Sequence, residues 1–420
     1  MDRTRGFLHA EVEARDWEEQ RSLQAARLRE VLALGEAQAP AVAALLRGAG
    51  ARAGDFHSLE DLGRLPVTPK ARLVELQREH PPFGGFLAVP LAQVRRIFRS
   101  PGPILDPQTP GEGWGWEEGL FAAGFRPGDV CVNTFGYQMT PAGMMFDEAL
   151  GALGCPLVPT GVGDRDTQIE ILRSLGVTGY TGMASFLLQI GERAREQGLD
   201  PARDFHLKAA FTTAEPLPDS LRNSVEEMFG ATVRQGFGTA ECGCLAYECH
   251  ERGGMHLASR AIVEIADPES GRPLGPGEIG EIVVTLLSPA FPLLRLGTGD
   301  LSAVDPVACA CGRPAPKLRG WLGRCDQLVK VKGMFLHPGA VQAAMRAFPE
   351  VARFRAVVTR EEGRDVLTVQ AEAQAPDEGL RVRIETRLRE ALGIGAGCRW
   401  VPGDSLPADG KVIDDLRKWD

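Results

Sequence analysis

The chain has 420 residues and carries 47 Lys and Arg against 56 Asp and Glu, a formal net charge of −9. Hydrophobic residues make up 44% and charged residues 25%, as in ordinary globular proteins, so the composition does not indicate disorder. The acidic balance argues against a nucleic-acid partner, which would require clustered Lys and Arg. Since no apolar stretch is long enough to span a membrane and nine cysteines occur without a secretion signal, we expect a cytoplasmic protein.

The first part of the chain is expected to be helical. Residues 16–46 place apolar side chains at helical spacing, among them Leu23, Leu28 and Leu32. The following segment SLEDLGRLPVTPKARLVEL offers a helix start at Ser58, a break at Pro66 and a restart near Thr68. A helix–turn–helix arrangement is therefore predicted there.

The middle of the chain alternates between short apolar runs and amphipathic stretches. The runs are candidate strands at Val130–Phe135, Pro156–Pro159, Gly179–Gly182, Ala209–Thr213 and Thr232–Gly236. The amphipathic stretches between them are candidate helices at Thr167–Leu175, Ser185–Gln197 and Leu217–Phe229. This alternation predicts an α/β fold in which a parallel sheet is covered by helices.

The remainder of the chain predicts two further parts. A β-rich subdomain is indicated by candidate strands at Ile262–Ile265, Glu281–Leu287 and Leu293–Leu296. The last part, from about Asp326, is expected to be an α+β cap. It begins with β structure and continues with helices and strands at His337–Phe348, Phe354–Thr359, Val366–Glu372, Glu378–Leu392 and near Arg399. We therefore expect a large N-terminal domain of residues 1–325 and a small C-terminal cap of residues 326–420.

Three short segments could carry chemistry, although each has an ordinary structural interpretation. In GFGTAECG the glycines would admit a ligand close to the backbone, but a plain glycine turn is equally compatible. In RLGTGDLSAV, Asp300 could bind a sugar diol or simply stabilise a turn. In PADGKVIDD, Lys411 beside a glycine could be carried into a distant site or remain a solvated surface lysine.

The order of these segments resembles the adenylate-forming superfamily. A glycine-rich turn ending in Glu is followed by T-G-D, by G-R-x-D and by a terminal G-K. The segments RPGDVCVNTFGYQMTPAG, FTTAEPL and GRCDQLVKVKGMFLHPGAVQ resemble the phenylacetate–CoA ligase-like branch in particular, and the likeness covers nearly the whole chain. It implies an ATP-dependent ligase that activates an aryl or arylacetic acid as an acyl-adenylate and transfers it to coenzyme A.

The resemblance also implies roles for individual residues. Lys411 and Glu241 would be catalytic, Lys411 reaching the carboxylate and α-phosphate and Glu241 binding Mg²⁺ beside the ATP phosphates. Asp326 would be the hinge, Tyr137 would contact the acyl group and Gly333 would border the coenzyme A tunnel. The nucleotide would be bound by Ala214, Glu215, Pro216, Phe237, Gly238, Thr239, Asp300 and Arg324.

The sequence departs from the family pattern where ATP phosphates would bind. The expected Ser/Thr/Gly-rich phosphate loop is replaced by FRSPGPILDPQTPG, in which Pro101 and Pro103 lack N–H groups that could cradle phosphate. The loop also lacks the basic residue of the family pattern. In addition, Ala240 stands immediately before Glu241, where the family usually has Thr, so Thr239 is one position early. A slow ligase, or a binding protein that has lost turnover, are both alternatives that this region leaves open.

The cysteines suggest a structural zinc site. Cys249 and His256 are seven residues apart, and Cys309 and Cys311 follow later; three thiolates and one imidazole form a familiar zinc ligand set. Many sequences of the resembled branch have similar Cys and His elements. The competing candidate ligands are Cys242, Cys244 and His250.

Several properties stay open at this point. The acyl group could pass to an amine or a carrier-protein thiol instead of coenzyme A. The identity of the acid is not determined by the sequence. Members of the family are often homodimers, but no interface can be identified from these residues.

Overall fold

The computed structural model describes the chain except for residues 1, 101–102, 110–112, 307, 326–328, 332–333, 337, 362–363, 408–410 and 418–420. The chain divides into two compact units. The first comprises Met1–Thr298 and Ala303–Gly320, and the second comprises Gly299–Ser302 and Trp321–Asp420. Each unit contains its own buried apolar core.

The N-terminal helices differ in one respect from the prediction. The single pattern expected over residues 16–46 is divided into α2 (Trp17–Gln38) and α3 (Pro40–Gly48). The break falls at Ala39 because Pro40 has no N–H to continue the first helix but suits the first turn of the next one. Shorter elements flank these helices: α1 (Ala10–Glu13), η1 (Ala53–Asp55), η2 (Glu60–Arg64), β1 (Thr68–Pro69), α4 (Lys70–Glu79) and η3 (Leu91–Gln93).

A nine-stranded sheet forms the centre of the first unit, with strand order β14-β15-β10-β9-β8-β7-β6-β4-β5. Five strands are parallel, and they correspond to the five predicted apolar runs: β4 (Cys131–Asn133), β5 (Leu157–Val158), β6 (Gly179–Gly182), β7 (Ala209–Thr212) and β8 (Thr232–Thr239). The remaining strands are antiparallel: β9 (Gly243–Tyr247), β10 (Met255–Leu257), β14 (Val304–Asp305) and β15 (Lys317–Leu318). The predicted parallel sheet is thus confirmed.

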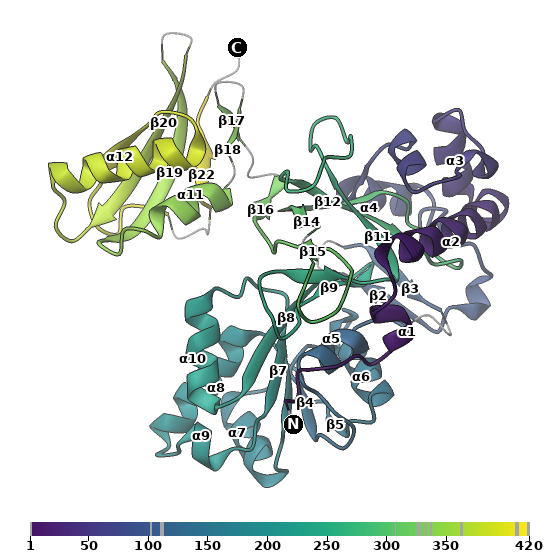
Figure 1. Cartoon of the computed structure of the whole chain (residues 1–420), viewed down its shortest axis with the longest axis horizontal. Helices are drawn as coiled ribbons and strands as arrows, with labels where there is room; N and C mark the ends of the chain where they lie inside the picture. The colour runs from purple at the N-terminus through teal and green to yellow at the C-terminus, as the bar shows by residue number, and fades with distance from the viewer. Residues whose placement is uncertain are drawn as a thin grey trace. The chain divides into compact units, whose positions relative to one another are not determined.

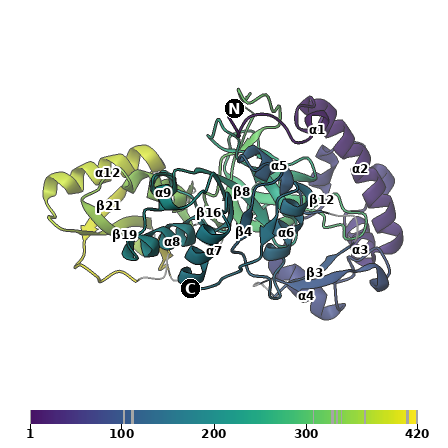
Figure 2. The ribbon, with the colours of Figure 1, turned by 90° about the horizontal axis from the view of Figure 1, so that it is seen from below.

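Helices cover both faces of the parallel strands (Figure 1, Figure 2). One face carries α7 (Arg165–Ser174), α8 (Ala184–Glu196), α9 (Pro201–Asp204) and α10 (Asp219–Phe229). The other carries α5 (Glu117–Ala122) and α6 (Ala142–Ala152). Two separate apolar cores lie between these layers, one including Ile169, Ile190 and Val225, the other including Phe146 and Phe211. Such a three-layer arrangement leaves the carboxyl ends of the parallel strands open to ligands.

A second sheet joins segments distant in sequence, in the order β1-β13-β12-β11. Its further strands are β11 (Ala261–Ala266), β12 (Gly280–Leu286) and β13 (Leu296–Ser302). The prediction of a strand over residues 293–296 is wrong, because β13 begins at Leu296 and continues to Ser302. The preceding Arg295 has a left-handed φ of +43°, which interrupts extended backbone before the strand starts.

The second unit is built around a four-stranded sheet of order β21-β20-β19-β22. Its elements in chain order are β16 (Gly323–Arg324), β17 (Val329–Val331), β18 (Met334–Leu336), α11 (Pro338–Met345), β19 (Val351–Glu361), β20 (Arg364–Ala373), α12 (Glu378–Leu392), β21 (Ala396–Trp400) and β22 (Ile413–Asp415). The two helices and the strands predicted for the cap are present among its described residues. The β structure predicted before the first helix of the cap is present as the short hairpin β17–β18.

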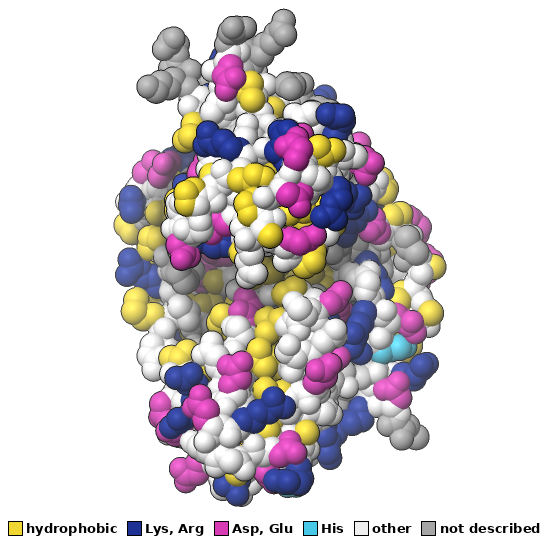
Figure 3. Space-filling view, turned by 90° about the vertical axis from the view of Figure 1, so that its left-hand side faces the viewer, with side chains coloured by type: hydrophobic (Ala, Val, Ile, Leu, Met, Phe, Trp, Pro, Cys, Tyr) yellow, Lys and Arg dark blue, Asp and Glu magenta, His cyan; other side chains and the backbone are white. Residues whose placement is uncertain are grey.

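Charged side chains of both signs are interspersed over the face shown in Figure 3, without a broad field of one sign. Among the described residues, no helix has the length and apolar composition required to cross a bilayer.

Candidate active site

The glycine-rich segment predicted to bind nucleotide forms the tip of the β8–β9 hairpin. The strand pairing shifts between Phe237 and Gly238, so the hairpin contains a bulge. Gly238 is required there because a Cβ atom would lie 2.2 Å from the Gly243 carbonyl oxygen. The Thr239 hydroxyl accepts a hydrogen bond of 3.2 Å from the Cys242 N–H and thereby closes the turn. The predicted magnesium ligand Glu241 is thus held, buried, at the tip.

The segment that replaces the family's phosphate loop is a hairpin of β2 (Arg96–Arg99) and β3 (Leu105–Gln108). The Ser100 N–H donates to the Ile104 carbonyl at 2.8 Å, and the Ile104 N–H donates to the Ser100 hydroxyl at 3.2 Å. Both N–H groups are therefore engaged in closing the hairpin. Because Pro103 has no N–H, none of these three residues offers a backbone donor to a phosphate.

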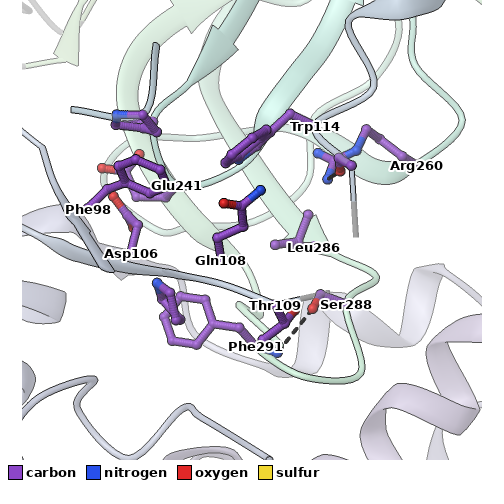
Figure 4. Close-up of a pocket in the computed structure, with 14 residues that line it drawn as sticks. Phe98, Asp106, Gln108, Thr109, Trp114, Glu241, Arg260, Leu286, Ser288 and Phe291 are labelled. Carbon is purple, nitrogen blue, oxygen red and sulfur yellow. Dashed lines mark hydrogen bonds between the residues drawn. The ribbon is translucent and has the colours of Figure 1, made fainter. Parts of the chain in front are cut away.

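A cavity lies between the tip of the β8–β9 hairpin and the strands of the β2–β3 hairpin (Figure 4). Its aromatic lining is Phe98, Trp114 and Phe291, and its polar lining includes Asp106, Gln108, Thr109, Glu241, Arg260 and Ser288. The rim is fixed by Arg260, whose guanidinium donates to the carbonyls of Cys242 and Gly113. The cavity can accept a ligand that combines a flat ring with charged groups.

Two charged residues of this region were not found from the sequence. Lys70, the first residue of α4, places Nζ 2.9 Å from Glu241 Oε2. Asp106 is a buried carboxylate in β3 that faces the cavity. Asp106 could have been found as an acidic residue at an inward position of a short strand. Lys70 could have been found as a lysine directly after the Thr-Pro pair that forms β1.

The turn predicted to line the adenine pocket follows β7. Ala214 adopts a left-handed φ of +71°, which few residues other than glycine tolerate. The carboxylate of Glu215 accepts hydrogen bonds from the N–H and the hydroxyl of Ser185, both at 2.7 Å. It therefore caps the first turn of α8, and Ala214 and Pro216 are the exposed residues of the turn. Phe237 is half-buried against the core beneath the second sheet.

Tyr137, the predicted acyl-pocket residue, lines an open pocket at the carboxyl ends of β4 and β5. Met144, Asp147 and residues 159–163 complete this pocket. The Tyr137 hydroxyl accepts a hydrogen bond of 2.9 Å from Asn133 and donates one of 3.3 Å to Asp147. Burial raises the pKa of Tyr137 to about 12, so the phenol remains protonated.

The second unit brings Asp300 and Arg324 together, as the sequence predicted. They are opposite residues in the antiparallel pairing of β13 and β16, and Arg324 Nη1 lies 3.1 Å from Asp300 Oδ1. The Trp321 indole N–H donates to the same carboxylate oxygen at 3.0 Å. Lys411 is exposed, shortly before β22. The predicted hinge Asp326 and the predicted tunnel residue Gly333 lie outside the described residues.

The four predicted zinc ligands also meet. Ligand atoms of Cys249, His256, Cys309 and Cys311 all lie within 4.8 Å of one another. The Sγ atoms of Cys249 and Cys309 are 3.7 Å apart, and His256 Nε2 lies 3.3 Å from Cys311 Sγ. His256 Nδ1 contacts the Ala315 carbonyl at 2.8 Å, which leaves Nε2 to face the thiols.

The alternative candidates Cys242, Cys244 and His250 are not part of this cluster. Cys242 and Cys244 are buried in the β8–β9 hairpin, where burial raises the pKa of both thiols, that of Cys242 to about 12. His250 Nε2 lies beside the Glu251 carboxylate at 3.1 Å.

Comparison with known proteins relates this arrangement to one enzyme family. The AMP-binding enzyme family matches residues 141–286, and the AMP-binding enzyme C-terminal domain matches residues 333–415. A phenylacetate-coenzyme A ligase of Thermus thermophilus is 31% identical over 446 residues, which cover 97% of this chain and 99% of the relative. The chain belongs to the phenylacetate–CoA ligase branch of the adenylate-forming enzymes. A phenylacetate-coenzyme A ligase of Escherichia coli is 26% identical, with 97% of each chain covered.

Solved structures agree with this assignment. A 2-hydroxyisobutyryl-CoA ligase, crystallised in an open conformation with 2-HIB-AMP and CoA, aligns with a TM-score of 0.85 and 24% identity. The alignment covers 96% of this chain and 93% of the other, which establishes the shared fold. Apo MatB from Rhodopseudomonas palustris aligns over 76% of this chain with a TM-score of 0.56 and 16% identity.

The predictions of the family, of the α/β fold with a C-terminal domain and of an AMP-forming acid–CoA ligase are confirmed. Within this phenylacetate–CoA ligase-like enzyme, the hairpin β2–β3 stands where the family pattern has the phosphate loop.

Proposed function

We propose that this ligase activates an aryl or arylacetic acid with ATP and transfers the acyl group to coenzyme A. The observation that carries the proposal is the relationship to the Thermus thermophilus ligase, whose length the chain covers to 99%. Supporting it, the predicted Glu241 is held at the tip of a hairpin beside an aromatic-lined cavity, and Asp300 and Arg324 are paired in the second unit.

In the proposed reaction a substrate carboxylate oxygen attacks the α-phosphorus of ATP, and pyrophosphate leaves. The thiolate of coenzyme A then attacks the acyl carbonyl carbon, and AMP leaves with the bonding electrons of the mixed anhydride. The Lys411 ammonium would stabilise negative charge on the α-phosphate, and Asp300 would bind the ribose hydroxyls. Both half-reactions would share one pocket if the C-terminal cap rotates between them. Lys411, which the cap carries, is therefore expected to act in the first half-reaction only.

The acid would bind in the pocket bordered by Tyr137 and Met144. An aromatic ring and a thioether are suitable neighbours for a flat, apolar group. Because the Tyr137 hydroxyl is already engaged by Asn133 and Asp147, it would present its ring rather than a free donor. This supports an aryl-containing acid over a short polar one.

Two metals complete the proposal. Glu241 would bind Mg²⁺, which supplies neutralising charge to phosphate oxygens when bound. Its buried carboxylate, ion-paired only to Lys70 among the described residues, is suited to a hard cation. Cys249, His256, Cys309 and Cys311 would hold a structural Zn²⁺; three thiols and an imidazole within 4.8 Å are consistent with a tetrahedral ion.

The remaining predictions complete the hypothesis. The domain boundary would fall between residues 325 and 326, with Asp326 as the hinge and Gly333 beside the path of coenzyme A. A cytoplasmic homodimer is the expected form of the enzyme.

An acid-panel assay tests the proposal. Pyrophosphate release should require ATP, Mg²⁺ and an arylacetic or aryl acid, and Lys411→Ala should lower it by about a hundredfold or more, the effect typical of losing a charge-stabilising group. Lys208→Ala, which removes another exposed lysine, should have no effect. The proposal fails if no acid in a broad panel stimulates release.

A second candidate is a nucleotide-binding homologue with weak or no turnover. It is favoured by the engagement of the Ser100 and Ile104 N–H groups within the hairpin. Loss of one charge-assisted contact costs about 1.5–3 kcal/mol, so the apparent affinity for ATP would fall one to two decades per lost contact. Calorimetric binding of ATP without acid-dependent pyrophosphate release would favour this candidate. Release that yields an amide instead of a thioester would identify an amine acceptor.

A further inference from the structure

Two carboxylates lie next to each other in the cavity between the β8–β9 tip and the β2–β3 strands (Figure 4). Glu241 comes from the turn after β8, and Asp106 comes from β3 within the segment that replaces the phosphate loop. Both residues are more than nine-tenths buried, with 7% and 6% of their surface exposed. The two elements are far apart in sequence, so only the folded chain brings these acids together.

Asp106 has no hydrogen-bond donor among the described residues. Neither of its carboxylate oxygens accepts a hydrogen bond, and both are inaccessible to solvent. A buried carboxylate normally accepts several hydrogen bonds or contacts a cation, because an unpaired buried charge is strongly destabilising. Asp106 is thus a buried hydrogen-bond acceptor that faces a cavity, and its partner is not among the described residues.

The negative charges of Asp106 and Glu241 are also not balanced by the neighbouring positive charge. Lys70 is paired with Glu241, at 2.9 Å, and is the only cation that the described residues place on the two acids. One ammonium beside two carboxylates leaves a net negative charge when both acids are ionised. Oxygen donors of this kind, with one negative charge in excess, suit a small hard divalent cation.

We infer that Asp106 and Glu241 together bind one divalent cation of the Mg²⁺ class. The Lys70 ammonium then competes with this cation for the Glu241 carboxylate. The inference rests on the proposed function, in which Glu241 alone would be the metal ligand, and it adds Asp106 from the replaced phosphate loop. The altered hairpin would then contribute to phosphate binding through the cation that Asp106 helps to hold, rather than through backbone N–H groups.

Mn²⁺ binding to the full-length, zinc-loaded protein tests this without turnover. Free Mn²⁺ is followed by electron paramagnetic resonance in the absence of ATP, with Mg²⁺ as the competitor. We expect one Mn²⁺ per chain at the site, weakened at least tenfold by Asp106→Asn and by Glu241→Gln. Lys70→Met should tighten binding, since it removes the competing ammonium. Asp166→Asn, which removes an exposed carboxylate paired with Arg193, should leave binding unchanged.

The variant Asp106→Asn is not expected to unfold the protein, because it replaces an unpartnered buried acid by a neutral group of the same shape. Its melting temperature should equal or exceed that of the wild type, and a folded variant that binds Mn²⁺ as the wild type does would overturn the inference. Absence of Mn²⁺ binding by the wild type would overturn it as well. Mn²⁺ binding without pyrophosphate release for any acid would instead sink the proposed function and leave the cation site standing.

Discussion

At the scale of single residues, three acids of this ligase differ in the partners that surround them. Glu241 is paired with Lys70, whereas burial and the nearby Glu241 charge raise the pKa of Asp106 against a smaller opposing effect of the Lys70 charge. Asp300 receives donors from Arg324 and Trp321 and remains suited to bind hydroxyl groups. Of the three acids, Asp106 alone lacks a hydrogen-bond or ion-pair partner among the described residues.

Glu118 provides a pH-dependent prediction at the same scale. Burial, together with the charges of Glu13 and Glu117, raises the pKa of Glu118 to about 7. A raised pKa means that the folded protein prefers the protonated acid, so this contribution to stability is complete below about pH 4.5 and is lost as the pH rises through 7. Its size is on the order of 1–3 kcal/mol, since one pKa unit corresponds to about 1.4 kcal/mol.

Thermal unfolding at pH 5.5 and pH 8 measures this effect. Glu118→Gln should melt at a higher temperature than the wild type at pH 8, and the difference should be small at pH 5.5. Equal differences at the two pH values would show that Glu118 does not titrate in this range.

At the scale of elements, the tip of the β8–β9 hairpin and the strands of the β2–β3 hairpin border the cavity, and the tip depends on a single glycine. A methyl group at Gly238 would meet the Gly243 carbonyl at 2.2 Å and the Trp116 ring at 2.7 Å. Gly238→Ala should therefore destabilise the unit by about 1–3 kcal/mol and displace Glu241. Pyrophosphate release should fall at least tenfold, while Gly54→Ala, at a glycine with open space around it, should behave as the wild type. Unchanged melting and activity of Gly238→Ala would contradict this description of the turn.

The cysteine cluster is connected to the N-terminal segment of the chain through Arg313. Arg313, two residues after Cys311, is buried and donates to Glu13 of α1 through Nε at 2.9 Å. Zinc bound by the cluster would thus hold the loop that anchors the N-terminal segment.

Metal content and melting temperature test that connection. Protein purified without chelator should contain about one zinc per chain, Cys309→Ser should lose it, and Cys398→Ser should retain it. Loss of zinc should lower the melting temperature by several degrees, because metal that binds only the folded state stabilises it. Zinc-free wild-type protein would contradict the assignment.

The sequence was most informative where chemistry and periodicity coincide. The five parallel strands, the zinc cluster and the Asp300–Arg324 pair were predicted because apolar runs and motif order depend on local sequence. Lys70 and Asp106 were missed because Glu241, beside which both lie, is more than 130 residues away along the chain. No local sequence pattern indicates such a long-range proximity. The hairpin β2–β3 was missed because Pro107 within β3 argues against a strand.

At the scale of the whole molecule, the chain forms two compact units and matches both the AMP-binding enzyme family and its C-terminal domain, while the hairpin β2–β3 departs from the phosphate-loop pattern. The described residues of its hairpin offer little to a triphosphate through the backbone, so ATP binding would depend on Lys70, Glu241 and the proposed cation. Catalysis at a modest rate, with weak affinity for ATP, is the behaviour expected from this arrangement.

The most direct test of the central claim is the product balance of a single reaction with an arylacetic acid, ATP, Mg²⁺ and coenzyme A, analysed by mass spectrometry. The account predicts AMP, pyrophosphate and acyl-CoA in equal amounts, and about a hundredfold less of each, or lower still, with Lys411→Ala. Formation of ADP and phosphate, or acyl-CoA without AMP, would contradict activation of the acid as an acyl-adenylate.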